Sequence, residues 1–136
     1  MPITGFDHLN IRTMNVEGTL RFFRDLLGMR ISPLPGRSDL AMGGWVLDPT
    51  GQALIHVNHG DYGYPTDADF APVTGAGSGP VHHLALKCAG FDQLRQRLVD
   101  AQVKFTQNLL PEYKLRQLFL QEPNGIFVEL NFWDNA

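Results

Sequence analysis

The chain has 136 residues and a mass of 15.2 kDa, a length that suits one domain with its own hydrophobic core. Hydrophobic residues make up 43% and charged residues 18% of it, which excludes a disordered polypeptide. A net charge of -3, a pI near 5.9 and a sequence without a basic cluster argue against nucleic acid as a partner.

The cysteine content and the hydropathy pattern bear on location. Cys88 is the single cysteine, so no intramolecular disulfide forms and no oxidising compartment is required. The first residues lack the layout of a signal peptide, and no apolar run approaches the roughly 20 residues that span a bilayer. We therefore expect a cytoplasmic protein that does not bind membranes.

An internal repeat organises the sequence. Residues 7–12, DHLNIR, match residues 82–87, HHLALK. Residues 48–58, DPTGQALIHVN, match residues 122–131, EPNGIFVELN, with Gln52 as the one insertion. Because both pairs have nearly the same separation, the two halves are interpreted as copies of one structural unit.

The elements of the first half follow in chain order. Residues 7–12 alternate polar and apolar, the pattern of a half-buried strand. A helix is expected next, with Asn15 as N-cap, Gly28 as C-cap and one apolar face formed by Val16, Leu20, Phe23 and Leu27. Three short strands follow, and the turn at residues 48–51 joins the last two.

The second half repeats this order. Its helix is expected to carry an apolar stripe formed by Phe91, Leu94, Leu98 and Ala101. We thus predict one domain over residues 1–136, with a first module at about 1–59, a linker at about 60–80 and a second module at about 81–136. The linker is rich in Gly, Pro and Asp; a plain connection and a lid that uses its aromatic residues are both open.

Four side chains at repeat-equivalent positions suggest a metal site. His8 and His83 lie on the first strand of each half, and His56 and Glu129 on the last. Since alternate strand residues share a face, each lies opposite apolar neighbours that face the helix. His82 and His59 fall on the other face and are expected to point away. The four side chains can converge if the halves pack about a pseudo-twofold axis.

These motifs resemble a known family. FDHLNIRT, VHHLALK, ALIHVN and EPNGIFVELNF are similar to segments of the vicinal-oxygen-chelate superfamily, which includes glyoxalase I, methylmalonyl-CoA epimerase, fosfomycin-resistance thiol transferases, extradiol dioxygenases and bleomycin-binding proteins. The resemblance covers nearly the whole chain apart from residues 60–80. The Pro-x-Gly turn followed by an apolar-Glu-apolar strand is its most specific part.

The resemblance implies an α+β fold of paired βαβββ modules that form a U-shaped, partly open sheet around a metal, commonly in a homodimer. It also implies metal-binding roles for His8, His83 and Glu129. The position of His56 holds Glu or Gln in the glyoxalase and epimerase branches. His56 therefore departs from the family pattern, and the branch stays open.

The number of ligands bears on the reaction. Four ligands on an octahedral divalent ion (Fe, Mn, Ni, Co or Zn) leave two positions for a small substrate with neighbouring oxygens, which the metal polarises. The C–H beside a polarised carbonyl is acidic, and Glu129 is the candidate base. This is isomerase or lyase chemistry. If only His8, His83 and Glu129 bind the metal, three positions remain, as extradiol dioxygenases require, and His56 acts as an acid or base.

Substrate contacts are less specific in the sequence. Trp45, Tyr113 and Phe119 lie on or beside the expected inner strands and suit an apolar substrate, although ordinary core packing is the stronger explanation for most of them. Arg12 shares the face of His8 and is a candidate for binding an anionic group. A third hypothesis is a protein that sequesters a drug or metabolite without chemistry. The ligand set argues against it, because such a cavity has no use for a metal.

Overall fold

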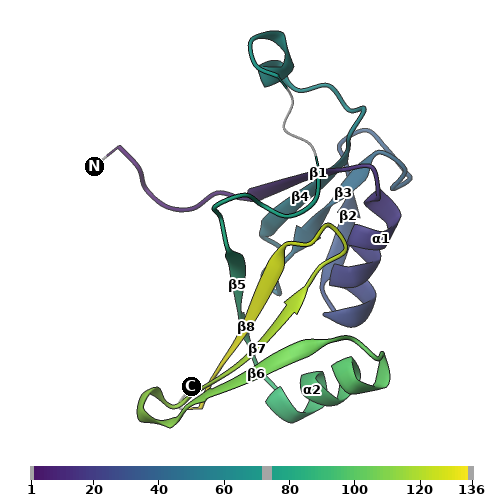
Figure 1. Cartoon of the computed structure of the whole chain (residues 1–136). Coiled ribbons are helices and arrows are strands. Elements are labelled where there is room, and N and C mark those ends of the chain that lie inside the picture. Colours follow the sequence, from purple (N-terminus) through teal and green to yellow (C-terminus); the bar gives the residue numbers. More distant parts are fainter. Residues whose placement is uncertain (1, 72–74, 135–136) are drawn as a thin grey trace. The chain divides into compact units, whose positions relative to one another are not determined.

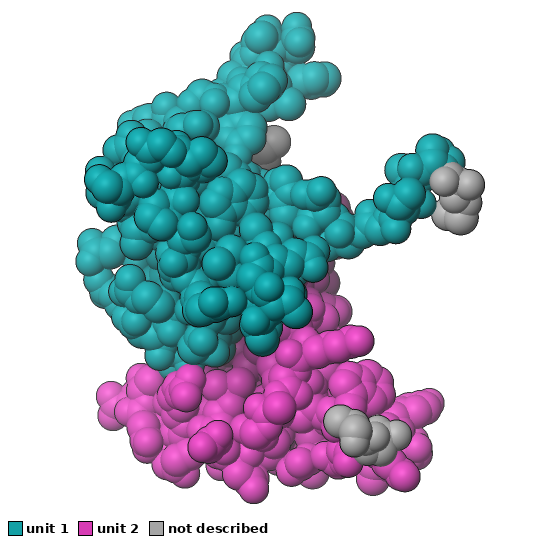
Figure 2. Space-filling model, turned by 180° about the vertical axis from the view of Figure 1, so that it is seen from behind, with its two compact units in different colours: residues 1–74 teal, residues 75–136 magenta. Residues whose placement is uncertain are grey.

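The computed structural model describes residues 2–71 and 75–134. The chain divides into two compact units, residues 1–74 and residues 75–136, coloured teal and magenta in Figure 2. Each unit contains a strand, a helix and three further strands in that order (Figure 1). The predicted duplication of a βαβββ module is therefore confirmed. No helix in the described residues is long and apolar enough to cross a membrane.

Unit 1 contains a four-stranded mixed sheet with the strand order β1-β4-β3-β2. The first strand pairs parallel with the last, and the other neighbours are antiparallel. Its elements are β1 (Leu9–Thr13), α1 (Val16–Arg21), the π-helical turn η1 (Phe22–Leu26), β2 (Arg30–Pro33), β3 (Gly43–Leu47), β4 (Ala53–His59) and the 3₁₀ helix η2 (Pro65–Ala68).

Unit 2 has the same topology, with the strand order β5-β8-β7-β6 and a parallel pairing of β5 with β8. Its elements are β5 (His83–Cys88), α2 (Phe91–Asp100), β6 (Phe105–Leu110), the 3₁₀ turn η3 (Pro111–Tyr113), β7 (Leu115–Gln121) and β8 (Phe127–Trp133).

The helix of unit 1 begins as its sequence predicts, but it changes to a π-helical turn at Phe22, and half-buried Leu27 is the C-cap in place of Gly28. The Asn15 side chain accepts a hydrogen bond from the backbone N–H of Gly18 at 3.0 Å and so caps the first turn. Val16, Leu20 and Phe23 are buried on the face that covers the sheet, and α1 contacts both β3 and β4. Beyond η1, Gly28 takes the left-handed conformation (φ 75°) that ends the helical segment.

The helix of unit 2 agrees with its predicted stripe except at one end. Phe91 and Leu98 are buried and Leu94 is half-buried. Ala101 lies after the last helical residue, as the C-cap, and is exposed. The assignment of Ala101 to the buried stripe is therefore wrong, because the helix ends one residue before it.

Equivalent carboxylates build the turn before the last strand of each unit. Asp48 accepts hydrogen bonds from the backbone N–H of Thr50 (2.8 Å) and of Gln52 (3.0 Å). Glu122 accepts the same pair of bonds from Asn124 (2.7 Å) and Ile126 (2.9 Å). The match between Gln52 and Ile126 corrects the position of the insertion in the repeat.

Unit 1 has one residue more than unit 2 after this turn, and strand pairing identifies it as Leu54. Leu47 pairs with Ala53 whereas Val46 pairs with Ile55, so the register shifts at this point. Leu54 is accommodated as a β-bulge. Beyond the bulge the two units return to the same register, which places His56 in the position of Glu129.

Strand alternation separates the core from the opposite face. Ile55 and Val57 of β4 are fully buried, as are Val128 and Leu130 of β8 to within 1%. Because successive strand residues point to opposite faces, the residues between them lie on the other side of each sheet. This alternation positions the candidate ligands of the last strands.

Candidate functional site

The candidate ligands form one pair in each unit. Unit 1 contributes His8, just before β1, and His56, in the middle of β4. Unit 2 contributes His83, the first residue of β5, and Glu129, in the middle of β8. His56, His83 and Glu129 lie on the parallel strands of their sheets as expected from the repeat, whereas His8 lies one residue before its expected strand.

In unit 1 one aromatic side chain contacts both imidazoles. Trp45 of β3 pairs with His56 across the strands, and their rings stack at a centroid distance of 4.1 Å and an interplanar angle of 21°. The ring of His8 meets the edge of Trp45 at 5.3 Å and lies 6.4 Å from the ring of His56. Trp45 therefore holds both imidazoles on one side of the sheet.

The free nitrogen atoms of this pair suit a metal. Nδ1 of His8 lies 2.6 Å from the Asp7 carboxylate, an arrangement that orients many metal-binding histidines through the nitrogen not used for the metal. Burial, and after it the Coulombic effect of His8, lowers the pKa of His56, which favours the neutral imidazole. Nε2 of His56 is buried and, within the described residues, has no hydrogen-bond partner.

In unit 2 the carboxylate of Glu129 faces an imidazole. Its Oε2 lies 3.8 Å from Nε2 of His83. Asn131 donates to Oε2 at 3.0 Å and Gln117 donates to Oε1 at 3.3 Å. Gln117 in turn accepts from Asn108 at 2.8 Å, so the carboxylate is oriented by a chain of amides.

The geometry of each pair can be compared with metal coordination. Two ligands at about 2.0–2.2 Å from one ion cannot be more than about 4.4 Å apart. The 3.8 Å between His83 and Glu129 satisfies this limit. Within either unit taken alone, the described residues hold no group of three or more His, Cys, Asp or Glu side chains arranged for a metal. The donor types in each unit, imidazole nitrogen and carboxylate oxygen, are ones that divalent ions bind.

The candidate substrate residues have different environments. Phe119 of β7 pairs with Glu129 in the register that Trp45 has with His56, and both aromatic side chains are half-buried beside a candidate ligand. Tyr113 lies in η3, at the other end of β7 from Phe119, and is 64% exposed. The structure does not bring Tyr113 close to Glu129.

Arg12 is engaged by its own chain. Its guanidinium donates to both carboxylate oxygens of Asp67, at 2.8 and 2.9 Å, and to the backbone carbonyls of Gly60 and Tyr62, each at 3.2 Å. This hydrogen-bonded pair lowers the pKa of Asp67 and raises the pKa of Arg12. The group predicted to bind an anionic substrate binds a carboxylate of the connecting segment instead.

The two histidines excluded from the site differ in outcome. His59 is the last residue of β4, and its Nδ1 accepts a hydrogen bond from the backbone of Asp61 at 3.0 Å. His82 precedes β5, so strand alternation does not apply to it, and its Nδ1 lies 3.0 Å from Nδ1 of His83. His82 therefore contacts a candidate ligand, and its expected orientation away from the metal site stays a prediction.

Sequence reasoning missed the polar residues that surround the ligands. Asn131 follows Glu129 by two residues, the spacing that shares a strand face. Gln117 is fixed by the β7–β8 register, which the sequence alone does not give. In unit 1, Tyr64 lies with its hydroxyl 3.4 Å from Nδ1 of His56, and no spacing rule connects these two residues.

Comparison with known proteins identifies the family. The chain belongs to the Glyoxalase/Bleomycin resistance protein/Dioxygenase superfamily, whose family model matches residues 5–130. The resemblance to vicinal-oxygen-chelate proteins is thereby confirmed. No curated protein gives a match to the chain.

Solved structures share the fold at low identity. An integron cassette protein from the mobile metagenome of Vibrio cholerae has a TM-score of 0.68 and 16% identity, and the match covers 98% of both chains. Lactoylglutathione lyase from Agrobacterium tumefaciens has a TM-score of 0.64 and 15% identity over 97% of this chain and 96% of that one. A fosfomycin resistance protein from Listeria monocytogenes has a TM-score of 0.65 and 14% identity, over 96% and 93%. At these identities the likeness shows the fold.

Proposed function

We propose that the protein is a divalent-metal-dependent enzyme that acts on a small substrate through two neighbouring oxygens, with glyoxalase-like isomerase or lyase chemistry. His8, His56, His83 and Glu129 would hold the ion, which is Fe, Mn, Ni, Co or Zn. The observation that carries the proposal is Nε2 of His56, a buried nitrogen without a partner in the described residues, on a neutral imidazole beside a second histidine. A buried polar atom without a partner is costly unless a ligand binds it.

The bound metal would supply Lewis-acid polarisation of the substrate oxygens. The protein supplies the rest. Asp7 orients His8, and Trp45 covers one face of His56 and restricts water there. Glu129 is the proton acceptor of the proposal, because it is the only carboxylate among the four side chains and the amides of Asn131 and Gln117 orient it.

Metal content tests the proposal directly. Protein purified without chelators is expected to contain stoichiometric metal. Inductively coupled plasma mass spectrometry measures this content. His56→Ala and Glu129→Ala should lose most of it, and His59→Ala is the matched control at the end of the same strand. Metal-free wild-type protein with an intact fold would contradict the proposal and favour a non-catalytic binding or drug-resistance protein. Activity is then assayed as lactoylglutathione lyase and against fosfomycin, the chemistry of two structural neighbours.

An extradiol dioxygenase is the second candidate, with His8, His83 and Glu129 as ligands and His56 as acid or base. The lowered pKa of His56 and the Tyr64 hydroxyl 3.4 Å from its Nδ1 favour this role, because a neutral imidazole with a hydroxyl neighbour transfers protons readily. Oxygen uptake with catechols distinguishes the two reactions. In the dioxygenase, His56→Ala keeps its metal and loses turnover; in the isomerase it loses both.

The assembly and location belong to the same proposal. We expect a cytoplasmic homodimer with a small-molecule substrate, and neither nucleic acid nor membrane as a partner. Sedimentation velocity at micromolar protein concentration measures the oligomeric state. A single species with the mass of one 15.2 kDa chain would contradict the dimer.

A further inference from the structure

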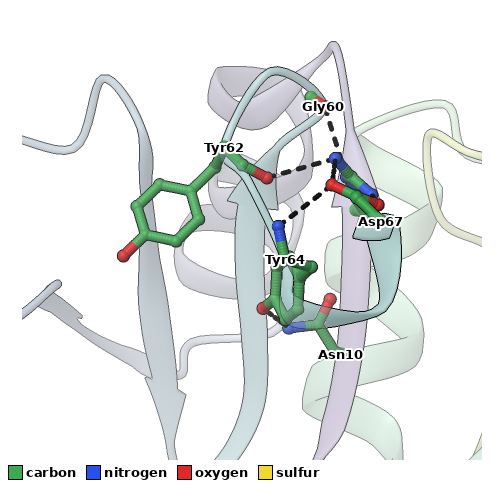
Figure 3. Close-up of polar contacts among 6 residues, drawn as sticks. Asn10, Gly60, Tyr62, Tyr64 and Asp67 are labelled. Atoms are coloured by element: carbon green, nitrogen blue, oxygen red, sulfur yellow. Dashed lines mark hydrogen bonds and ion pairs between the residues drawn. The ribbon is translucent and has the colours of Figure 1, made fainter. Parts of the chain in front are cut away.

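The segment that follows β4 is fastened to β1 through Arg12. Asp67 of η2 accepts two hydrogen bonds from the Arg12 guanidinium and also one from the backbone N–H of Tyr64 at 3.0 Å. The carbonyls of Gly60 and Tyr62 accept further bonds from Arg12. The contacts are drawn in Figure 3, where Asp67 lies close to the backbone of Tyr64. Residues 60–67 are therefore held at several points against one strand.

This fastening fixes Tyr64 beside a candidate ligand. Its ring lies 5.6 Å from the guanidinium carbon of Arg12, and its hydroxyl accepts a hydrogen bond from the Asn10 side chain (Figure 3). The same hydroxyl lies 3.4 Å from Nδ1 of His56. Asn10 and His56 are paired residues of β1 and β4, so Tyr64 contacts both parallel strands of unit 1.

The hydrogen-bonding capacity of these groups favours one of the two ring nitrogens of His56 as the carrier of its proton. The phenol oxygen of Tyr64 accepts from Asn10 and has a second acceptor site for an N–H. If Nδ1 of His56 carries the proton, it donates to that site, and Nε2 keeps its lone pair. If the proton were on Nε2, a buried N–H would lack an acceptor in the described residues, and Nε2 would be unable to bind a metal.

We propose that Tyr64 is a positioning residue that holds His56 in the Nδ1–H tautomer and so presents the Nε2 lone pair to the metal site. The role in metal binding rests on the proposed function; the tautomer itself does not. A free histidine in water prefers the Nε2–H form, so the proposal predicts a measurable reversal.

Nitrogen NMR of the metal-free protein tests the tautomer. With ¹⁵N-labelled histidine, His56 is assigned as the signal lost in His56→Gln. In the wild type we expect an Nδ1–H pattern for it, and in Tyr64→Phe, which keeps the ring and removes the hydroxyl, a shift toward Nε2–H. Tyr62→Phe, in the same segment, is the matched control and should leave the pattern unchanged. An Nε2–H pattern in the wild type, or an identical pattern in Tyr64→Phe, would overturn the proposal.

Titration with Zn²⁺ alone tests the consequence for binding. Loss of an outer hydrogen-bond partner of a metal ligand typically weakens affinity about 10- to 100-fold, and we expect this for Tyr64→Phe. In a His56→Ala background the same substitution should cause no further loss, because its effect passes through His56. An additional loss in that background would assign Tyr64 a merely structural role. If the wild type binds no Zn²⁺ at all, the proposed function fails, while the NMR pattern still decides the role of Tyr64.

Discussion

Trp45 stacks on His56 across the β3–β4 pair, and Phe119 holds the corresponding place opposite Glu129 in β7–β8. The repeat thus provides each candidate ligand of a last strand with an aromatic neighbour on the adjacent strand. A flat side chain in this position covers the ligand on one side and limits its rotation. The pairing gives the most direct prediction about the site of unit 1.

Trp45→Ala is expected to lower the free energy of unfolding by about 1–3 kcal/mol, because a half-buried aromatic contact is lost. Trp45→Phe should recover part of this loss. Urea unfolding followed by circular dichroism measures both. Trp133→Ala is the control, since that side chain is 45% exposed at the end of β8, and its expected change is about 0.5 kcal/mol or less. Equal losses at the two positions would contradict the prediction.

The ion pair between Arg12 and Asp67 should govern how tightly residues 60–67 are held. Arg12→Lys removes the bidentate contact with the Asp67 carboxylate but keeps the positive charge. We expect faster cleavage in this segment by a nonspecific protease, read by mass spectrometry of the fragments. Arg37→Lys is the control, because the ion pair between Arg37 and Asp39 is more exposed. Its cleavage rate should match that of the wild type.

The same ion pair predicts a dependence on pH. Arg12 lowers the pKa of Asp67, so its stabilising contribution is fully present above the ordinary aspartate pKa of about 4 and is lost as the pH falls through the lowered value. Protection of residues 60–67 from proteolysis should therefore persist at pH 5 and decline only in stronger acid, measured with an acid-active protease. In Asp67→Asn the segment should already be cleaved rapidly at pH 5.

The two turn carboxylates should differ in importance despite their equivalent hydrogen bonds. Glu122 is only 2% exposed, and its removal leaves the part-buried N–H groups of Asn124 and Ile126 without their acceptor. We expect Glu122→Ala to cost about 1–3 kcal/mol of unfolding free energy. Asp48→Ala should cost less, because water can replace the carboxylate in an exposed turn. Denaturant titration of both variants is the measurement, and a larger effect for Asp48→Ala would contradict the interpretation.

Removal of the proposed metal should abolish activity and leave the secondary structure intact. The hydrophobic cores consist of residues such as Val57 and Val128, and the four candidate ligands do not contribute to them. After dialysis against a chelator, the far-ultraviolet spectrum should be unchanged. The unfolding temperature should fall, since a ligand at 100 times its dissociation constant adds about 2.7 kcal/mol of stability. Loss of the β-sheet spectrum on chelation would contradict this.

Much of the fold follows from local patterns. The alternation around His56 and Glu129, the cap at Asn15 and the repeated turn acids are all short-range signals, and the structure confirms them. The predicted position of the insertion, Gln52, is wrong because one extra residue can be accommodated at any position near a turn. Strand register identifies Leu54 as the bulge.

The surroundings of the site were less predictable. Arg12 and Asp67 are 55 residues apart, and no periodicity links a strand residue to a 3₁₀ helix in an irregular segment. Asn108 reaches Gln117 through a hairpin pairing that sequence patterns do not specify. The convergence of His8, His56, His83 and Glu129 on one ion stays a prediction, because it requires residues from both compact units.

The stacking of Trp45 on His56 also gives the protein an optical reporter. The chain contains two tryptophans: Trp45 of β3, which stacks on an imidazole, and Trp133, which is 45% exposed at the end of β8. Indole emission depends on its immediate neighbours, so an event at His56 would alter the fluorescence of one tryptophan and not the other. With Trp133→Phe as background, the remaining emission would follow occupancy of the site without any added label.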